Sequence, residues 1–321
     1  MQSFAALVAA FESRFSQELP FPDEPGNLYD PCRYLLGLGG KRVRPVLCLM
    51  TSELLGEINE DAWHAAEAIE LLHNFTLIHD DIMDKAPLRR GNPTVHHKYG
   101  MTAGILGGDV MCIYAYESLV KIRKSLPQII RAFNRAAIEI CEGQQMDMDF
   151  ESRNDVSIDE YLRMIMLKTS VLLACSLKIG AVSGGALGDT AGKLYDFGIN
   201  LGLAFQLQDD YLDAFGDPAL LGKLNGGDII ANKKTFLLLK ALENADTAQK
   251  SQIADLLKSD SDEKVQLMLA LYTATGADAA CKETIADYSQ RAFACLEDVA
   301  VPAVRKQPLV DLANYLLVRE K

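Results

Sequence analysis

Two short acidic segments of the same pattern stand out in this chain of 321 residues. Each has aspartates at its first, second and fifth positions and follows an apolar stretch: Asp80-Asp81-Ile82-Met83-Asp84 and Asp209-Asp210-Tyr211-Leu212-Asp213. Carboxylates crowded this closely repel one another unless a cation neutralises them, and ligands that are all oxygen select Mg²⁺ or a similar hard ion. Because Mg²⁺ usually completes its coordination with water and substrate phosphates, the pattern predicts a polyphosphate ester held between two helices.

Helical geometry places chemically useful side chains of each cluster on one face. At about 100° per residue, Asp84 lies about 40° from Asp80, and His73 lies about 20° from it. The second cluster aligns in the same way, with Gln206 about 60° from Asp209. Polar groups on an otherwise apolar helix cost free energy unless they are paired or bind a ligand. Salt bridges at a helix end would explain one cluster, but two matching clusters favour a shared ligand.

Basic residues occur in three places near these clusters. They are Lys41, Arg42 and Arg44 after the glycine turn Gly39-Gly40, then Arg89 and Arg90, then Lys223, Lys233 and Lys234. Cations are unfavourable at a helix N-terminus, so Lys41 and Arg44 are predicted to face an anion there. Each basic segment alone would more often be a solvated surface. Their positions beside the acidic clusters favour phosphate binding.

Composition excludes several other classes of protein. The net charge of −12 argues against nucleic-acid binding, which needs a basic face. The seven cysteines are odd in number and never spaced as Cys-x-x-Cys, which predicts reduced thiols rather than disulfides or a zinc site. The N-terminus lacks the features of a signal peptide, and no uninterrupted apolar run is long enough to span a membrane. We therefore expect a cytoplasmic protein with no membrane span.

Apolar residues recur at three- and four-residue spacing along nearly the whole chain, which predicts helices and no sustained strand. The predicted helices cover residues 2–18, 42–55, 60–84, 101–121, 127–149, 157–182, 188–215, 232–243, 246–258, 261–273, 276–296 and 300–319. Glycine and proline clusters separate them. No linker, repeat or low-complexity tract divides the chain. The sequence therefore predicts one all-α domain over residues 1–321, a helical bundle around a central cavity.

Taken together, the motifs resemble the polyprenyl synthetase family, the trans-isoprenyl diphosphate synthases of the farnesyl and geranylgeranyl type. In chain order they are Gly39-Gly40-Lys41-Arg42-x-Arg44-Pro45, Leu77-Ile78-His79-Asp80-Asp81-x-x-Asp84, Arg89-Arg90-Gly91, Gly143-Gln144-x-x-Asp147, Lys168-Thr169, Phe205-Gln206-x-Gln208-Asp209-Asp210-x-x-Asp213, Gly222-Lys223 and Gly227-Asp228-Ile229. Any one motif is weak, but this order and spacing are highly specific. The resemblance extends over almost the full length of the chain.

The resemblance implies head-to-tail prenyl transfer, in which isopentenyl diphosphate condenses with an allylic diphosphate (dimethylallyl, geranyl or farnesyl). It implies Mg²⁺, three ions per active site, bridged to Asp80, Asp84 and Asp209, with support from Asp81, Asp210 and Asp213. Family roles assign to the allylic substrate Arg89, Lys168, Thr169, Gln206, Lys223 and Lys233. They assign to isopentenyl diphosphate Lys41, Arg44, His73 and Arg90. The resemblance also implies a homodimer.

In this family, residues just before the first acidic cluster set the length of the product. Here they are Phe75 and Thr76. The helical wheel places Thr76 about 40° from Asp80, beneath the cluster, and Phe75 on the flank. Family farnesyl synthases with the same short cluster carry two aromatic residues here, and long-chain synthases carry small residues at both positions. The intermediate pattern predicts a C15–C20 product, with Phe75 as the obstruction. Gly198 and Gly202 predict close helix packing or, alternatively, room for the tail.

Three rival interpretations are considered. A class I terpene cyclase shares the first cluster but usually has a different second motif and lacks the Lys41–Arg44 site. A helical His-Asp metal phosphohydrolase could use His79 and Asp80, with His73 as a further ligand, but would not need the second cluster. A non-catalytic subunit of a heteromeric synthase should have lost its aspartates, whereas this chain keeps all six. The sequence favours the synthase.

Overall fold

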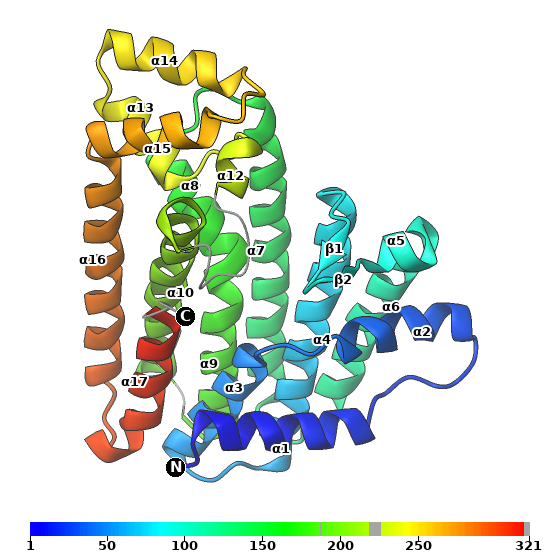
Figure 1. Ribbon diagram of the computed structural model, residues 1–321. Helices are drawn as coiled ribbons and strands as arrows, with labels where there is room; N and C mark the ends of the chain where they lie inside the picture. The colour runs from blue at the N-terminus through cyan, green and yellow to red at the C-terminus, as the bar shows by residue number, and fades with distance from the viewer. Residues whose placement is uncertain (187, 218–225, 318–321) are drawn as a thin grey trace. The chain divides into compact units, whose positions relative to one another are not determined.

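The computed structural model describes residues 1–186, 188–217 and 226–317, which are almost entirely helical (Figure 1). In chain order the elements are α1 (Phe4–Gln17), α2 (Gly26–Gly37), α3 (Val43–Leu55), α4 (Glu60–Met83), β1 (Leu88–Arg89), β2 (Asn92–Pro93), α5 (Val95–Tyr99), α6 (Met101–Val120), α7 (Leu126–Ser152), α8 (Ile158–Ile165), η1 (Met166–Ser170), α9 (Val171–Ser183), α10 (Asp189–Phe215), α12 (Gly227–Ile230), α13 (Phe236–Asn244), α14 (Thr247–Leu257), α15 (Lys264–Ala274), α16 (Ala277–Glu297) and α17 (Ala303–Leu317). The predicted all-α class is confirmed.

Local sequence explains where several helices begin. Ser3 and Asn59 accept hydrogen bonds from backbone N–H groups at the starts of α1 and α4. At α8, the side chain of Ser157 accepts from the Glu160 amide while the Glu160 carboxylate accepts from the Ser157 amide. Such caps satisfy N–H groups that have no partner within the helix, and each stabilises its helix by about 1 kcal/mol.

Several elements differ from the sequence prediction. Helix α2 was not predicted, because Gly26 and the internal Pro31 weaken its helical pattern. Strands β1 and β2 pair antiparallel after α4, where only a loop was expected. The predicted helix over residues 157–182 is interrupted by the π-helical turn η1, because periodicity does not reveal a single wide turn. The end of the predicted helix over residues 300–319 lies outside the described residues.

The chain divides into two compact units, each assembled from segments that are distant in sequence. Unit 1 comprises Met1–Ala137, Cys175–Tyr195 and Val299–Leu309, and unit 2 comprises Ile138–Ala174, Asp196–Asp298 and the residues from Val310 onward. The prediction of one domain around a central cavity stays a prediction.

In unit 1, helix α3 is buried on almost every side. Its residues from Pro45 to Ser52 are all buried, so it forms the centre of the unit. Helix α9 approaches it closely at Gly180, where an added Cβ would lie 2.2 Å from the carbonyl oxygen of Cys48. Only glycine permits this backbone contact, since any side chain would overlap the neighbouring helix.

In unit 2, apolar side chains from α8, α10, α13 and α16 form one cluster. It includes Tyr161, Leu207, Leu237 and Cys281. Helix α10 contacts the π-helical turn at Gly202, where an added Cβ would lie 2.6 Å from the Cα of Ser170. Close helix packing, the favoured explanation for Gly202, is therefore confirmed.

In the described part of the chain, one continuous helical segment is long and apolar enough to cross a membrane. It covers Ile158–Ser183, and 78% of its most apolar window is buried inside the protein. Burial of this kind is typical of a core helix, so length and composition alone are weak grounds for a membrane span.

Candidate active site

The first acidic cluster ends helix α4 in unit 1, and its three aspartates have different environments. Asp81 is buried, with 2% of its surface exposed, and Arg89 of β1 binds both of its oxygens. The two contacts, from Nε to Oδ2 and from Nη2 to Oδ1, are each 2.7 Å long. Asp80 is half-buried and Asp84 is exposed. Arg89 therefore neutralises Asp81, and Asp81 holds Arg89 in place. That Asp80 and Asp84 bind metal stays a prediction.

The basic residues of unit 1 gather around His73 on α4. Arg44 Nη1 lies 3.2 Å from His73 Nε2. Burial lowers the pKa of Arg44 to about 10. Burial and then the neighbouring cations, Arg44 first, lower the pKa of His73 well below its ordinary value, so this histidine is neutral at neutral pH. The Nε of Arg44 is buried and has no hydrogen-bond partner in the described part of the chain. These features indicate a site prepared for an anion.

Arg90 joins this group across the glycine turn that precedes α3. Its guanidinium nitrogens lie 3.0 and 3.1 Å from the position that a Cβ of Gly40 would occupy. Gly39 and Gly40 have positive φ angles of 73° and 155°, which glycine adopts readily. Burial and then Arg42 lower the pKa of Arg90. The predicted turn is confirmed, and its glycines allow the Arg90 guanidinium to lie against the backbone next to Lys41, which is exposed.

A buried ion pair supports this basic cluster from inside unit 1. Arg42 Nη1 donates to Glu70 Oε1 at 2.5 Å, and Arg42 Nη2 donates to the carbonyl oxygen of Leu36 at 3.0 Å. The amide of Asn74 also donates to Glu70 Oε1 at 2.9 Å. Arg42 and Glu70 were not predicted as site residues, because a buried pair between two helices leaves no local sequence pattern. They fix the start of α3, and therefore Arg44, against α4.

The second acidic cluster lies on α10 in unit 2, where Asp210 is part of a buried hydrogen-bond network. The hydroxyl of Tyr161 donates to Asp210 Oδ2, and Gln206 Nε2 donates to Asp210 Oδ1 at 3.0 Å. Thr169 Oγ1 donates to Gln206 Oε1 at 3.1 Å. Burial raises the pKa of Asp210 to about 7. Asp209 is half-buried. The network orients Gln206, and it identifies Tyr161 as a site residue that the sequence analysis missed.

Asp213, the last aspartate of this cluster, organises the segment that begins at Gly226. Its Oδ2 accepts from the backbone amide of Asp228 at 2.9 Å, and its carbonyl oxygen accepts from Gly226 at 2.7 Å. Lys233 Nζ lies 3.3 Å from Asp228 Oδ1. The structure therefore links Asp213 with Lys233 through Asp228. Lys223 lies outside the described residues.

Lys168 and Thr169 lie in the π-helical turn η1. The amide of Val171 donates to the carbonyl of Met166, five residues earlier, so this turn is wider than an α-helical turn. Gly143 of α7 makes room for it, because an added Cβ there would lie 2.4 Å from the Lys168 amide nitrogen. Such turns are frequent at functional sites, and no sequence signal marked this one.

The side chain of Lys168 is paired with Asp147 of α7 at 2.6 Å. Both residues belong to motifs that carried the family resemblance, and the structure shows that they contact each other. In unit 2, hydrogen bonds thus join the predicted residues Thr169, Gln206 and Asp210, and Lys168 forms a separate pair with Asp147.

The two predicted chain-length residues, Phe75 and Thr76, lie on α4 between one and one and a half helical turns before Asp80. The hydroxyl of Thr76 donates to the carbonyl oxygen of His73 at 2.8 Å, so it is turned back onto its own helix. The ring of Phe75 lies edge-on to His79, with 4.8 Å between ring centroids. Both residues are half-buried. Their predicted role in chain length stays a prediction.

Within the described residues, no group of three or more His, Cys, Asp or Glu side chains is arranged to enclose a metal ion. This is compatible with Mg²⁺, which proteins often hold through one or two carboxylates while substrate phosphates and water supply the other ligands. The candidate donors are all oxygens, which suits Mg²⁺ rather than Zn²⁺. The residues therefore fit a metal that binds together with a diphosphate.

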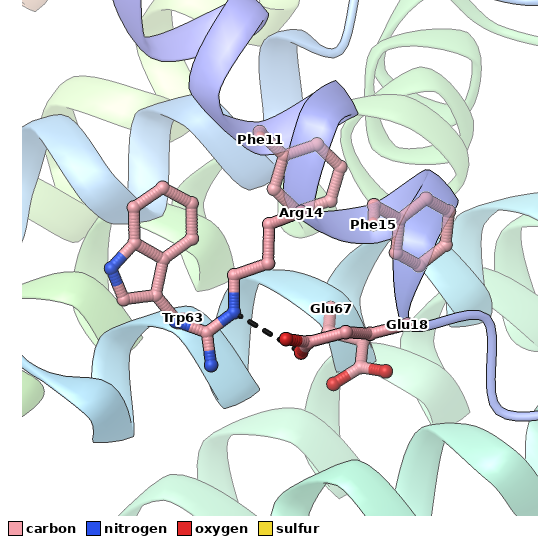
Figure 2. A pocket seen from close by; sticks show the side chains of 6 residues that line it. All are labelled: Phe11, Arg14, Phe15, Glu18, Trp63 and Glu67. Carbon is pink, nitrogen blue, oxygen red and sulfur yellow. Dashed lines mark ion pairs between the residues drawn. The ribbon is translucent and has the colours of Figure 1, made fainter.

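A pocket elsewhere in unit 1 contains none of these residues (Figure 2). It is lined by Phe11, Arg14, Phe15, Glu18, Trp63 and Glu67. The guanidinium of Arg14 lies 5.2 Å from the ring centroid of Trp63, and its Nε lies 3.4 Å from Glu18. Its charged side chains already form ion pairs, so this pocket is not a candidate for binding diphosphate.

Comparison with known proteins identifies the family. A family model described as Polyprenyl synthetase matches residues 25–274. A geranylgeranyl pyrophosphate synthase from Geoglobus acetivorans is 40% identical over 310 residues, covering 95% of this chain and 94% of that protein. A geranylfarnesyl diphosphate synthase from Natronomonas pharaonis is 35% identical over 324 residues, covering 95% and 93%. A crystal structure of a geranylgeranyl pyrophosphate synthase matches with a TM-score of 0.94, 44% identity and full coverage of both chains. The chain belongs to the polyprenyl synthetase family.

Membership of the polyprenyl synthetase family decides against the terpene cyclase and the His-Asp metal phosphohydrolase. The contacts of the two histidines agree with this for the phosphohydrolase. His79 Nε2 lies 3.1 Å from the carbonyl oxygen of Ile105, and His73 faces Arg44. Neither contact is the one that a His-Asp metal phosphohydrolase would require.

We predict that His73 makes the ligand-free protein sensitive to acid. Because the folded state lowers the pKa of His73, the unfolded chain binds its proton more readily, and stability falls as the pH drops below about 6.5. In thermal unfolding followed by circular dichroism, the melting temperature of the wild type should fall more between neutral and acidic pH than that of His73→Gln. Inorganic diphosphate should reduce the difference. Parallel curves without diphosphate would contradict the prediction.

Proposed function

We propose that this protein is a short-chain trans-prenyltransferase that condenses isopentenyl diphosphate with dimethylallyl, geranyl and farnesyl diphosphates. The observation that carries the proposal is the basic cluster of unit 1. Arg44, Arg90 and His73 lie together, their pKa values are lowered, and Arg44 keeps a buried donor without a partner. A polyanion of high charge density would relieve that repulsion, and diphosphate is such a group. Membership of the polyprenyl synthetase family supports the same substrate class.

The acidic clusters are proposed to bind Mg²⁺ through Asp80, Asp84 and Asp209, three ions in each active site. Asp81, Asp210 and Asp213 would act mainly by holding Arg89, Gln206 and the Asp228–Lys233 pair, as their contacts in the structure favour. When bound, the metal would neutralise negative charge on the leaving diphosphate. The family's use of divalent metal supports this assignment, and the number of ions is part of the proposal.

The allylic substrate is proposed to contact Arg89, Lys168, Thr169, Gln206, Lys223 and Lys233. As its C–O bond breaks, positive charge develops on the allylic carbon, and oxygen atoms of the π-helical turn and of Gln206 are suited to stabilise it. Thr169 and Asp210 hold the Gln206 amide in one orientation, so its dipole is fixed before the reaction begins. A preoriented dipole requires no reorganisation when the charge appears.

Isopentenyl diphosphate is proposed to bind Lys41, Arg44, His73 and Arg90. Its double bond attacks the allylic carbon, a carbon–carbon bond forms, and the departing diphosphate takes up the proton that is lost. This assignment of the proton to diphosphate explains why no side chain needs to act as the base. Water must be excluded because it would capture the cation.

The product is proposed to lie in the C15–C20 range, with C20 favoured. Of the two positions that set product length before the first cluster, one holds the aromatic Phe75 and the next holds the small Thr76. Several relatives are named geranylgeranyl diphosphate synthases, which supports the upper end of the range. The Natronomonas pharaonis relative is named for a longer product, so product sizing must include C25 standards.

We further propose that the protein acts as a homodimer in the cytoplasm. Helix α6 supports the dimer, because it carries solvent-exposed apolar side chains at Met101, Ile105, Leu106, Ile113 and Val120. Exposed apolar side chains gathered along one helix are typical of protein–protein interfaces.

Both acidic clusters should be required for catalysis. In assays with isopentenyl diphosphate, an allylic diphosphate and Mg²⁺, Asp80→Ala and Asp209→Ala should each lower kcat by at least about 10²-fold, because charge stabilisation of the leaving group is lost. Circular dichroism controls for folding. A folded variant with near-normal turnover would show that its cluster is dispensable.

The two substrates should respond differently to loss of Arg44. Arg44→Ala should raise the KM for isopentenyl diphosphate on the order of 10-fold or more, since a charge-assisted hydrogen bond to phosphate is removed. The KM for the allylic diphosphate should change much less. Equal increases for the two substrates would mean that Arg44 is assigned to the wrong site.

Product length should depend on Phe75 and Thr76. Phe75→Ala removes the proposed obstruction and should lengthen the product by at least one five-carbon unit, whereas Thr76→Phe fills the path under Asp80 and should shorten it. Mass spectrometry of the dephosphorylated alcohols gives the distribution, and initial turnover is the control. An unchanged distribution in both variants would place the floor of the cavity elsewhere.

A further inference from the structure

The imidazole of His79, which follows Phe75 by one helical turn on α4, is partly covered by neighbouring groups of unit 1. Its Nε2 lies 3.1 Å from the carbonyl oxygen of Ile105 on α6. A carbonyl only accepts hydrogen bonds, so Nε2 carries the proton and donates it. Asp109 Oδ1 lies 3.8 Å from the same nitrogen. The hydrogen bond fixes the orientation of the ring.

Helix α6 also makes the space that the ring occupies. A Cβ added to Gly108 would lie 2.3 Å from His79 Nε2 and 2.5 Å from its Cδ2. Real Cβ atoms do not approach other atoms so closely, so the imidazole takes the place of a side chain at position 108. The ring therefore touches the backbone of α6 on one side. Phe75 packs edge-on against it, with 4.8 Å between centroids.

We propose that His79 is a positioning residue for product length, which holds the Phe75 ring in place and is itself seated on Gly108 and the Ile105 carbonyl. The inference rests on the proposed function, and in particular on Phe75 as the obstruction to the growing tail. It adds that this obstruction is not fixed by Phe75 alone. The glycine at position 108 determines how far the His79–Phe75 pair extends from α6.

The test uses two glycines that are neighbours on α6. Gly108→Ala must displace the imidazole. We expect the displaced ring to push Phe75 into the path of the tail and to shorten the main product by one five-carbon unit. Gly107→Ala is the matched control, because its added Cβ would meet Cys32 Sγ at 3.5 Å and Pro31 Cβ at 3.7 Å, which are ordinary contacts. Its product distribution should match that of the wild type. Products are sized by mass spectrometry, and initial turnover is measured in parallel.

Two further variants separate this role from a general packing defect. His79→Ala removes the support of Phe75 and should lengthen the main product. In the His79→Ala background, Gly108→Ala should no longer shorten it, because the ring that the methyl group displaces is gone; such non-additivity is the signature of direct contact. If Gly108→Ala does not fold, His79→Ala alone decides the question.

The possible failures are distinguishable. A wild-type chain that forms no prenyl diphosphate would overturn the proposed function together with this inference. A wild type that forms product, with Gly108→Ala and His79→Ala leaving its length unchanged, would overturn the inference alone. Loss of turnover at unchanged product length would also overturn it, because His79 would then support the neighbouring Asp80 instead of Phe75.

Discussion

The cost of burying charge in a helical interior governs how the proposed site is built. Arg42 is paired with Glu70 and Asp81 with Arg89, and Asp210 is held by Tyr161 and Gln206. Each contact satisfies a buried charge and fixes one side chain of the proposed site. These pairs leave the cost of burying Arg44 and Arg90 beside His73, which lowers the pKa of all three groups. The proposed diphosphate ligand would supply the negative charge that this cluster lacks.

The sequence was sufficient for the all-α fold and for the position of most helices, because apolar periodicity and glycine or proline breaks are local properties. It missed α2, whose internal Pro31 obscures the pattern. It also did not show that Arg89, across a turn, contacts both oxygens of Asp81, because helical angle alone does not identify a partner. Glu70 and Tyr161 were missed for the same reason: their partners come from other helices.

The glycines show what the structure adds to the sequence. The sequence predicted a turn at Gly39-Gly40 and close packing at Gly202, but it did not identify the neighbouring groups. The structure shows that Gly40 admits the Arg90 guanidinium, Gly143 admits the backbone of the π-helical turn, and Gly108 admits the His79 ring. In each case, the space that a side chain would fill at the glycine is taken by a residue near the proposed active site. Their absent side chains leave space for the groups proposed to bind, orient or limit the substrate.

The interleaving of the two units has a consequence for how the chain is made. Unit 1 receives its final segment, Val299–Leu309, only after all the central residues of unit 2 have been synthesised. Because the chain is synthesised from its N-terminus, unit 1 cannot be completed early. The first helices of unit 1 must wait for partners that are synthesised much later. Contacts between such distant segments slow folding and leave apolar helices exposed meanwhile. The nascent chain is therefore a natural client for chaperones, and a protein truncated before Val299 would lack a part of unit 1.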